Sequence, residues 1–502
     1  MSTTADLGAA DPQPRNITVA LMIGALTVSV TSTLGTPLIP TIADSQGVSL
    51  ETAQWLLTIT MLVGAVVTPV IGRLGDGARR ARLLHFTLGS VVAGSLVAGT
   101  AQHFPQLLAG RAIQGIGYAT VPLAIALARE LLEGEQQRRA IAALSITVAV
   151  GAGLGFPVTG LIAEYADYHT AFLVAAAFGL MAIALLRRHL PRSAAEHVPV
   201  ELDWAGAVLL GVGLGSLLLA ITKGAGWGWS EPPILGLLSL AFLTLACWGV
   251  VEWRTPHALV DLRLSARRPV LGANLTAVLV GMGMFMGLAL VNRLAQTPTS
   301  QGYGFSTSLV VTGLVLLPLS VGSVVSQRIA RAMASRFGMR TVLAVGCLVV
   351  GLSLAYTAGN HDHLAQLALL TVLLGVGVGT TFAAMPALIV ASVPEHRTGS
   401  AMSLNQVLRT VGGALGSALA ATILASHTPH GERFPSEDAF TTAFLVGALA
   451  CVGGLIVSLA VVPPSAASTP AGAAVEELEL LMEEAAAGAG TGPSTFDGED
   501  DR

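Results

Sequence analysis

Long apolar segments, separated by short polar connections, recur along the whole chain. A helix needs about 20 apolar residues to span the hydrocarbon core of a bilayer. Fourteen segments meet this requirement and predict membrane-spanning helices, at residues 17–40, 52–72, 83–101, 105–131, 139–162, 170–187, 204–222, 234–253, 270–291, 307–328, 341–358, 364–392, 399–425 and 439–462. The alternation of apolar and polar positions over about ten residues, which marks a transmembrane barrel, is not found. We therefore expect an all-α polytopic membrane protein.

Composition excludes two other classes of protein. Of the 502 residues, 53% are hydrophobic and 11% are charged, and the mean hydropathy is +0.71. A soluble globular protein carries about 25% charged residues, and a disordered chain combines few apolar residues with a high net charge. The formal net charge here is only -4. We therefore expect membrane lipids as the surroundings of the chain and no nucleic acid as a partner.

The distribution of basic residues predicts the orientation of the helices. When both termini are placed on one side, most of the 26 Lys and Arg residues fall in the N-terminal tail and in the connections on that side. Cytoplasmic connections of membrane proteins are enriched in Lys and Arg. We therefore expect a multi-pass protein of the plasma membrane with both termini in the cytoplasm.

Features of the first six predicted helices recur eight helices later. An arginine-rich connection follows residues 52–72 and a similar one follows 307–328, and helices 139–162 and 399–425 are both rich in glycine. Transporters often contain such repeats, with the substrate site at their interface. The predicted domains are a cytoplasmic tail at 1–16, a six-helix bundle at 17–187, a linker with two extra helices at 188–269, a second six-helix bundle at 270–462 and a disordered acidic cytoplasmic tail at 463–502.

The connection that begins at residue 72 combines glycines, one acid and several arginines. An aspartate can accept backbone N–H groups at a helix N-terminus and pair with neighbouring arginines, and glycines let another helix approach closely. These properties predict a conformational latch between the two bundles, formed by Gly72, Gly75, Asp76, Arg79, Arg80 and Arg82. The matching connection in the second half has Ser335 where an acid would stand, so the prediction does not extend to it.

Arg111 lies inside the predicted helix 105–131 and is followed by Gln114 and Gly115. A charged side chain within a span costs about 3 kcal/mol on insertion scales, so it should face a polar cavity or a partner instead of lipid. The repeat-related position holds Leu373, which indicates that a bundle does not need this charge to fold. We therefore expect a functional role for Arg111, with Gln114 as its hydrogen-bonding neighbour.

Helix 139–162 contains a dense run of small residues with one proline. Small residues let two helices approach closely, and proline interrupts the ladder of backbone hydrogen bonds. The run predicts a helix-packing hinge or sliding surface formed by Gly151, Gly153, Gly155, Pro157 and Gly160.

These three motifs resemble those of the major facilitator superfamily, and the count of fourteen helices is similar to that of its drug:proton antiporter (multidrug efflux) branch. The resemblance covers residues 17–462. It implies a secondary-active exporter of small amphipathic compounds, such as drugs or antibiotics, that works by alternating access and is driven by protons. Arg111 and Gln114 would then take part in proton coupling or substrate contact.

The sequence lacks the residue patterns that ATP binding, catalysis and metal binding require. The chain has no glycine-rich phosphate loop with its lysine, so ATP is not an expected partner. No paired carboxylates, no nucleophile with a base and no metal-ligating cluster occur at a common depth, so we expect neither an enzyme nor a metal site. No cofactor is expected.

The first predicted helix departs from the family pattern. Aligned on Pro40, Thr31 occupies the place where the resemblance implies an aspartate. Thr31 and Thr33 can form hydrogen bonds in a cavity, but a hydroxyl group cannot exchange a proton at neutral pH. The absence of this acid leaves open a carrier or flippase for a lipid or an endogenous metabolite, uncoupled or differently coupled. A ligand-binding membrane sensor, with the acidic tail as its output, is a further alternative.

The helix at 399–425 contributes Asn405, Gln406 and Arg409 to the predicted cavity. Gln406 and Arg409 lie three residues apart and therefore share a helix face. With Arg111 and Arg409 as buried cations and no acid at mid-membrane, we expect a cavity that prefers anionic or zwitterionic amphiphiles to cationic dyes.

Overall fold

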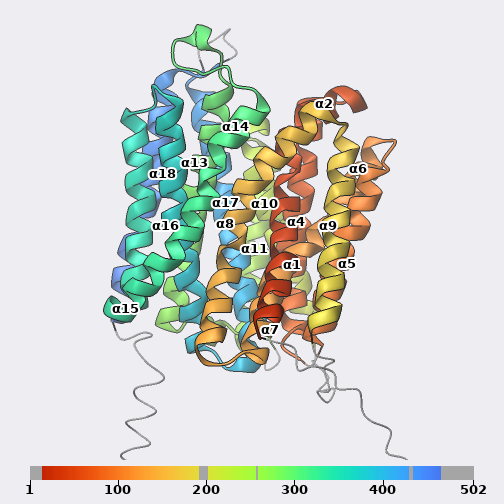
Figure 1. Ribbon diagram of the computed structural model, residues 1–502, viewed down its shortest axis with the longest axis vertical. Coiled ribbons are helices and arrows are strands. Elements are labelled where there is room, and N and C mark those ends of the chain that lie inside the picture. Colours follow the sequence, from red (N-terminus) through yellow and green to blue (C-terminus); the bar gives the residue numbers. More distant parts are fainter. Residues whose placement is uncertain (1–13, 78, 191–201, 256–257, 429–433, 465–502) are drawn as a thin grey trace, which may run out of the picture.

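The computed structural model describes residues 14–464, apart from 78, 191–201, 256–257 and 429–433. All regular secondary structure in this part of the chain is helical. Figure 1 shows long helices that run along the longest axis of the molecule, with the N-terminal and C-terminal helices gathered in two neighbouring groups. The predicted all-α polytopic fold is confirmed. Residues 1–13 of the predicted tail 1–16, and residues 465–502 of the predicted tail 463–502, lie outside the described residues.

The first group of helices, called here the first bundle, extends from residue 14 to residue 189. It consists of α1 (Pro14–Thr33), α2 (Gly35–Gln46), α3 (Leu50–Ala53), α4 (Trp55–Leu74), α5 (Arg80–Gly99), α6 (Phe104–Gly115), the 3-10 helix η1 (Ile116–Ala119), α7 (Thr120–Leu131), α8 (Gly134–Tyr165) and α9 (Tyr168–His189).

Two long helices, α10 (Trp204–Trp227) and α11 (Pro232–Arg254), follow as a hairpin, and the short α12 (Leu262–Ser265) leads onward. The remaining helices are called the second bundle. They are α13 (Arg268–Gln296), η2 (Thr299–Gln301), α14 (Leu309–Leu316), α15 (Pro318–Gly359), α16 (Leu364–Ser392), η3 (Glu395–Arg397), α17 (Thr398–Ser426) and α18 (Glu437–Val461).

The chain reverses direction inside α15. Gly338 has φ +78° and ψ 165°, which is not helical, and glycine tolerates this backbone conformation because it lacks a Cβ. Gly322 packs against Val372 and Val376 of α16, and Gly346 packs against Gly377 of the same helix. A straight helix would separate two residues 24 positions apart by about 36 Å, so the segments before and after Gly338 lie side by side.

This reversal explains the number of membrane crossings. Thirteen stretches among the described residues are long and apolar enough to span a bilayer, and one of them, Leu309–Gly359, has 51 residues. Because that stretch folds back at Gly338, it supplies two crossings. The described residues therefore contain fourteen crossings, as the sequence predicts.

The observed helices differ from the expected ones at several places. Pro14, Arg15 and Asn16, expected in the tail, form the start of α1. The predicted helix 17–40 is interrupted at Leu34, between α1 and α2. The predicted helix 105–131 changes to the tighter 3-10 geometry at Ile116–Ala119, an irregularity that often marks a hinge.

The α10–α11 hairpin packs directly against both bundles. Leu210, Leu214 and Leu218 of α10 share one apolar cluster with Ala65 of α4 and Val411 of α17. In the connection between α10 and α11, the indole Nε1 of Trp229 donates a hydrogen bond to Thr422 Oγ1 of α17 at 3.0 Å. The hairpin therefore covers the line along which α4 and α17 meet.

Candidate functional site

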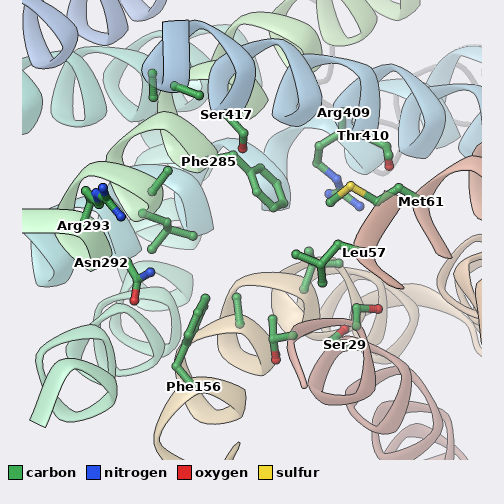
Figure 2. A pocket seen from close by; sticks show the side chains of 18 of the residues that line it. Ser29, Leu57, Met61, Phe156, Phe285, Asn292, Arg293, Arg409, Thr410 and Ser417 are labelled. Carbon is green, nitrogen blue, oxygen red and sulfur yellow. The ribbon is translucent and has the colours of Figure 1, made fainter. Parts of the chain in front are cut away.

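A cavity of about 640 Å³ lies between the two bundles. Figure 2 shows side chains from both bundles converging on this space. The residues that line it include Ser29, Ser32, Thr33, Leu57, Met61, Tyr118 and Phe156 from the first bundle, and Phe285, Asn292, Arg293, Gln406, Arg409, Thr410 and Ser417 from the second. Sites for drug-sized molecules commonly enclose about 300–1,000 Å³ and combine apolar walls with a few polar groups. This cavity has both properties.

The residues that line the cavity show that it reaches one end of the molecule. Asn292 and Arg293 lie in the last turns of α13, and Thr428 and Pro435 lie in the connection between α17 and α18. We call the other end, which carries Arg73, Arg80, Arg129 and Arg397, the arginine-rich end. The cavity thus extends away from the arginine-rich end.

Arg409 is a charged residue among those that line this cavity. Its side chain is 6% exposed, and its guanidinium group stacks on the ring of Phe382 at 4.3 Å from the centroid. One terminal nitrogen donates to Gln406 Oε1, while Nε has no hydrogen-bond partner in the described part of the chain. Gln406 and Arg409 thus share a face as predicted, and Arg409 keeps an unused donor for a further partner.

Arg293 is a second cation of the cavity that the sequence did not reveal. The hydropathy pattern ends the predicted helix at residue 291, which places Arg293 in a connection, whereas α13 continues to Gln296. Pro298 would have been the better stop signal, because helices commonly end shortly before a proline. Figure 2 shows Arg293 and Arg409 on different sides of the cavity, with Phe285 between them. None of the described residues that line the cavity is a carboxylate.

Arg111 occupies a different environment from the one expected. It is fully buried and does not line the cavity. Its Nε donates to Leu56 O at 3.2 Å, and one terminal nitrogen donates to Thr31 O at 3.2 Å and to Gln114 Oε1 at 2.8 Å. The guanidinium group therefore joins α1, α4 and α6 within the first bundle. Gln114 is its hydrogen-bonding neighbour, as expected.

The other predicted cavity residues divide into two sets. Thr33, Gln406 and Arg409 line the cavity. Thr31 is buried and its hydroxyl donates to Thr27 O at 2.7 Å within α1. Asn405 donates to Asn274 Oδ1 of α13 at 3.1 Å, so it joins two helices of the second bundle.

The glycines of α8 separate onto two faces. A Cβ on Gly151 or Gly155 would overlap Ser29 or Thr33 of α1, so these two glycines allow close packing within the first bundle. A Cβ on Gly153 would overlap Ser320 at the start of α15, in the second bundle.

The second face of α8 continues along the boundary between the bundles. A Cβ on Gly160 would lie 3.0 Å from Leu309 O, and one on Gly313 would lie 2.7 Å from Pro157 Cα. Ser320 Oγ also donates to Val150 O at 2.8 Å. The motif predicted to be a hinge therefore forms a direct contact surface between the two bundles.

The predicted latch residues lie at the arginine-rich end, where α4 meets α17. Asp76 Oδ1 accepts the backbone N–H of Ser400 at 3.1 Å, and Asp76 Oδ2 lies 3.7 Å from Arg73. A Cβ on Gly72 would overlap Ser403 of α17, and one on Gly75 would overlap Leu123 of α7. Burial raises the pKa of Asp76, and the hydrogen bonds from Ser400 partly offset this effect.

Arginines add further bonds between the bundles at the same end. Arg80 donates to Gly75 O at 2.7 Å, pairs with Glu130 at 2.8 Å and donates to Glu395 O of the second bundle at 3.2 Å. Arg129, which the prediction did not include, donates to Thr398 Oγ1 at 2.6 Å and to Val393 O at 3.1 and 3.2 Å.

Two of the predicted latch arginines are exposed, with Arg79 directly before α5 and Arg82 in its first turn. In the matching connection of the second half, the hydroxyl of Ser335 donates to Ala332 O within its own helix. The bonds between the bundles at this end therefore involve the first-half connection, α7, η3 and α17.

Comparison with known proteins shows which protein family the chain matches. The model of the Major Facilitator Superfamily matches residues 21–330 and 298–487. The chain is 27% identical over 422 residues to the tetracenomycin C resistance and export protein of Streptomyces glaucescens, covering 84% of this chain and 77% of that protein. It is 31% identical over 430 residues to the puromycin resistance protein pur8 of Streptomyces alboniger, covering 82% of each. Multidrug resistance protein 3 of Bacillus subtilis is 24% identical over 411 residues, covering 81% of this chain and 79% of that protein.

A solved structure supports the fold. The crystal structure of the human organic anion transporter MFSD10 (TETRAN) matches with a TM-score of 0.61 at 16% identity, covering 89% of this chain and 100% of that one. The family match and the apolar helices indicate a transporter and not an enzyme, inserted in the cell membrane by many crossings. The chain therefore belongs to the major facilitator superfamily.

Proposed function

We propose that this protein exports small amphipathic compounds by alternating access, driven by protons, and that it prefers anionic or zwitterionic substrates. The observation that carries the proposal is the cavity between the bundles, which has two arginines and no carboxylate among its described lining residues. Relatives named for resistance to, or export of, antibiotics support efflux as the direction of transport.

The contacts between the bundles support alternating access. At the arginine-rich end, Asp76, Arg80 and Arg129 bond across the boundary, while the cavity extends toward the opposite end. If the arginine-rich end faces the cytoplasm, as the positive-inside rule predicts, this is the outward-facing arrangement. Opening toward the cytoplasm then requires these bonds to break and α8 to slide or hinge against α14 and α15.

Arg409 and Arg293 would act on an anionic substrate at different depths. The carbonyl of Arg409 lies against Gly281 of α13, and Arg293 stands twelve residues further along the same helix. The backbone positions are therefore about 18 Å apart along the helix axis. We assign substrate binding to the buried Arg409, and capture or release at the cavity mouth to the exposed Arg293.

The test is proton movement in inside-out vesicles that contain the protein and have an acidic interior. Anionic, zwitterionic and cationic amphiphiles of similar size are added in turn, and uptake of each is followed in parallel. We expect an anionic or zwitterionic compound to be taken up and to collapse the pH gradient. Arg409→Gln should lower its uptake at least tenfold, whereas Arg188→Gln, which changes an exposed arginine of α9, should leave it unchanged.

Two other outcomes would contradict the substrate class or the proton coupling. Uptake of cationic compounds alone, unaffected by Arg409→Gln, would contradict the predicted substrate class. Uptake without proton movement would favour an uncoupled or differently coupled carrier or flippase, an alternative supported by the lack of a carboxylate in the described cavity lining.

The sensor alternative has its own test. It assigns the output to residues 463–502, almost all of which lie outside the described part of the chain. Truncation after residue 462 should abolish function if the protein is a sensor, whereas unimpaired export by the truncated protein would contradict the sensor.

A further inference from the structure

Two carboxylates meet at the arginine-rich end of the α10–α11 hairpin, outside the central cavity. Asp203 caps the start of α10, where its Oδ1 accepts the backbone N–H of Gly206 at 2.9 Å. Glu252 lies in the last turn of α11, is 2% exposed, and accepts the backbone N–H of Val260 through Oε1. One oxygen of each carboxylate is thus used by the backbone.

The two remaining oxygens lie close together beside Gly206. Asp203 Oδ2 and Glu252 Oε2 are both buried, and neither has a hydrogen-bond partner among the described residues. They lie 2.5 and 2.6 Å from the point where a Cβ of Gly206 would stand, so they are at most 5.1 Å apart. Only glycine leaves room for both oxygens at this position.

Two carboxylates whose free oxygens are buried this close together are costly when both are ionised, because like charges repel and none of the described residues donates to these oxygens. A single proton removes this cost, since it neutralises one carboxylate and supplies the missing hydrogen-bond donor. We propose that Asp203 and Glu252 form a proton-binding site in which the pair holds one proton between Asp203 Oδ2 and Glu252 Oε2.

The surroundings connect this site to the latch. The groups that face Glu252 are Asp203 on α10, the backbone N–H groups of Leu259 and Val260, and the charge of Arg73 on α4. Arg73 also faces Arg397 and pairs with Asp76, while its own Nε has no hydrogen-bond partner among the residues that the structure describes. Loss of the shared proton adds a second negative charge beside Arg73. The carboxylate pair then competes with Asp76 for the guanidinium group of Arg73. Proton release at this site therefore weakens the contact that closes the arginine-rich end.

The experiment is an infrared titration of the purified full-length protein in lipid nanodiscs, which follows the carbonyl stretch of protonated carboxyl groups. This readout needs neither a substrate nor transport, so its failure is distinguishable from failure of the proposed export function. Asp76→Asn is measured first, because Asp76 is itself a buried acid with a raised pKa and contributes its own band. In that background we expect a band equivalent to one proton that persists above the ordinary range of carboxylic acids and is lost as the pH rises further.

The variants assign the band. Glu252→Gln should abolish it, and Asp203→Asn, which keeps an oxygen for the Gly206 N–H, should move its loss to lower pH because the like charge is gone. Asp261→Asn is the matched control, since Asp261 lies near the same end and its carboxylate accepts two backbone N–H groups, from Arg263 and Leu264, at 3.1 Å each. This control should leave the band unchanged.

Three results would overturn the proposal. These are the absence of the band, a band that survives both Glu252→Gln and Asp203→Asn, and a band that Na⁺ or K⁺ abolishes at constant pH with a saturating dose dependence. The last result would identify a site for a monovalent cation in place of a proton.

Discussion

The backbone N–H of Ser400 donates a hydrogen bond to Oδ1 of Asp76 at 3.1 Å, across 324 positions of sequence. This bond joins the end of α4 to the start of α17, where Gly72 and Gly399 also let the two backbones approach. The carboxylate is buried and its other oxygen lies 3.7 Å from Arg73. Closure of the arginine-rich end therefore depends on one acid with a defined set of partners.

Changing Asp76 should alter the balance between closed and open arrangements. Asp76→Ala removes the acceptor for Ser400 and should open the arginine-rich end, at a cost of about 1–3 kcal/mol to the closed arrangement. Asp76→Asn keeps the acceptor and should stay closed. The measurement is the distance between spin labels at Gln136→Cys and Arg336→Cys, with the exposed Cys247 replaced by serine. Equal distance distributions for Asp76→Ala and the unchanged protein would show that the bond does not control closure.

The same labels test a pH dependence. Burial raises the pKa of Asp76 in the closed arrangement, so this arrangement binds the proton more tightly than an open one with a solvated carboxyl. Acid should therefore favour closure, and the preference should fade as the pH rises through the raised pKa. Asp76→Asn should remove the part of the pH response that depends on this residue. An identical pH response in Asp76→Asn would assign the whole effect to other groups.

Gly153→Ala should impair transport more than folding. The added methyl group would overlap Ser320 across the boundary between the bundles, where overpacking costs about 1–3 kcal/mol. Gly151→Ala would instead overlap Ser29 within the first bundle and should lower thermal stability. Gly89→Ala is the control, because its Cβ would meet nothing within 4 Å. Transport rate and melting temperature are measured for all three, and a similar loss of both in Gly153→Ala and Gly151→Ala would contradict the distinction.

Arg111→Gln should reveal a positioning role within the first bundle. The change removes the charged donor to the carbonyl oxygens of Leu56 and Thr31, at about 1.5–3 kcal/mol for each hydrogen bond, although Leu56 O keeps a hydrogen bond from Thr60 Oγ1 at 2.8 Å. We expect a lower melting temperature, with substrate affinity of the folded fraction within threefold of the unchanged protein. Arg188→Gln should change neither quantity. A tenfold or greater loss of affinity at unchanged stability would instead assign Arg111 a direct part in substrate contact.

The hydrogen bond from Trp229 to Thr422 should couple the inserted hairpin to the second bundle. Trp229→Phe and Thr422→Val each remove this bond, so each should destabilise the protein by about 1 kcal/mol. The double variant should be little worse than either single one, because the interaction is lost once. Thermal unfolding of the four proteins in one detergent measures the coupling, and strictly additive effects would exclude it.

The sequence by itself determined the number and approximate limits of the crossings, because each depends on a local run of about 20 apolar residues. It also identified Asp76, Arg111, Arg409 and the small residues of α8, since a charge or a dense run of glycine stands out in an apolar segment. Helix ends were less well defined. The break at Leu34 and the extension of α13 to Gln296 depend on packing that the hydropathy pattern does not record.

The tertiary structure alone decided which of these residues face the cavity. Arg111 and Arg409 both lie within apolar helices, yet one donates to carbonyl groups of α1 and α4 and the other faces a space between the bundles. The partners of a side chain come from helices far away in sequence, as with Ser400 for Asp76 and Ser320 for Gly153. For the same reason the meeting of Asp203 and Glu252 cannot be read from their positions along the chain, since it requires α10 and α11 to pack as a hairpin over Gly206.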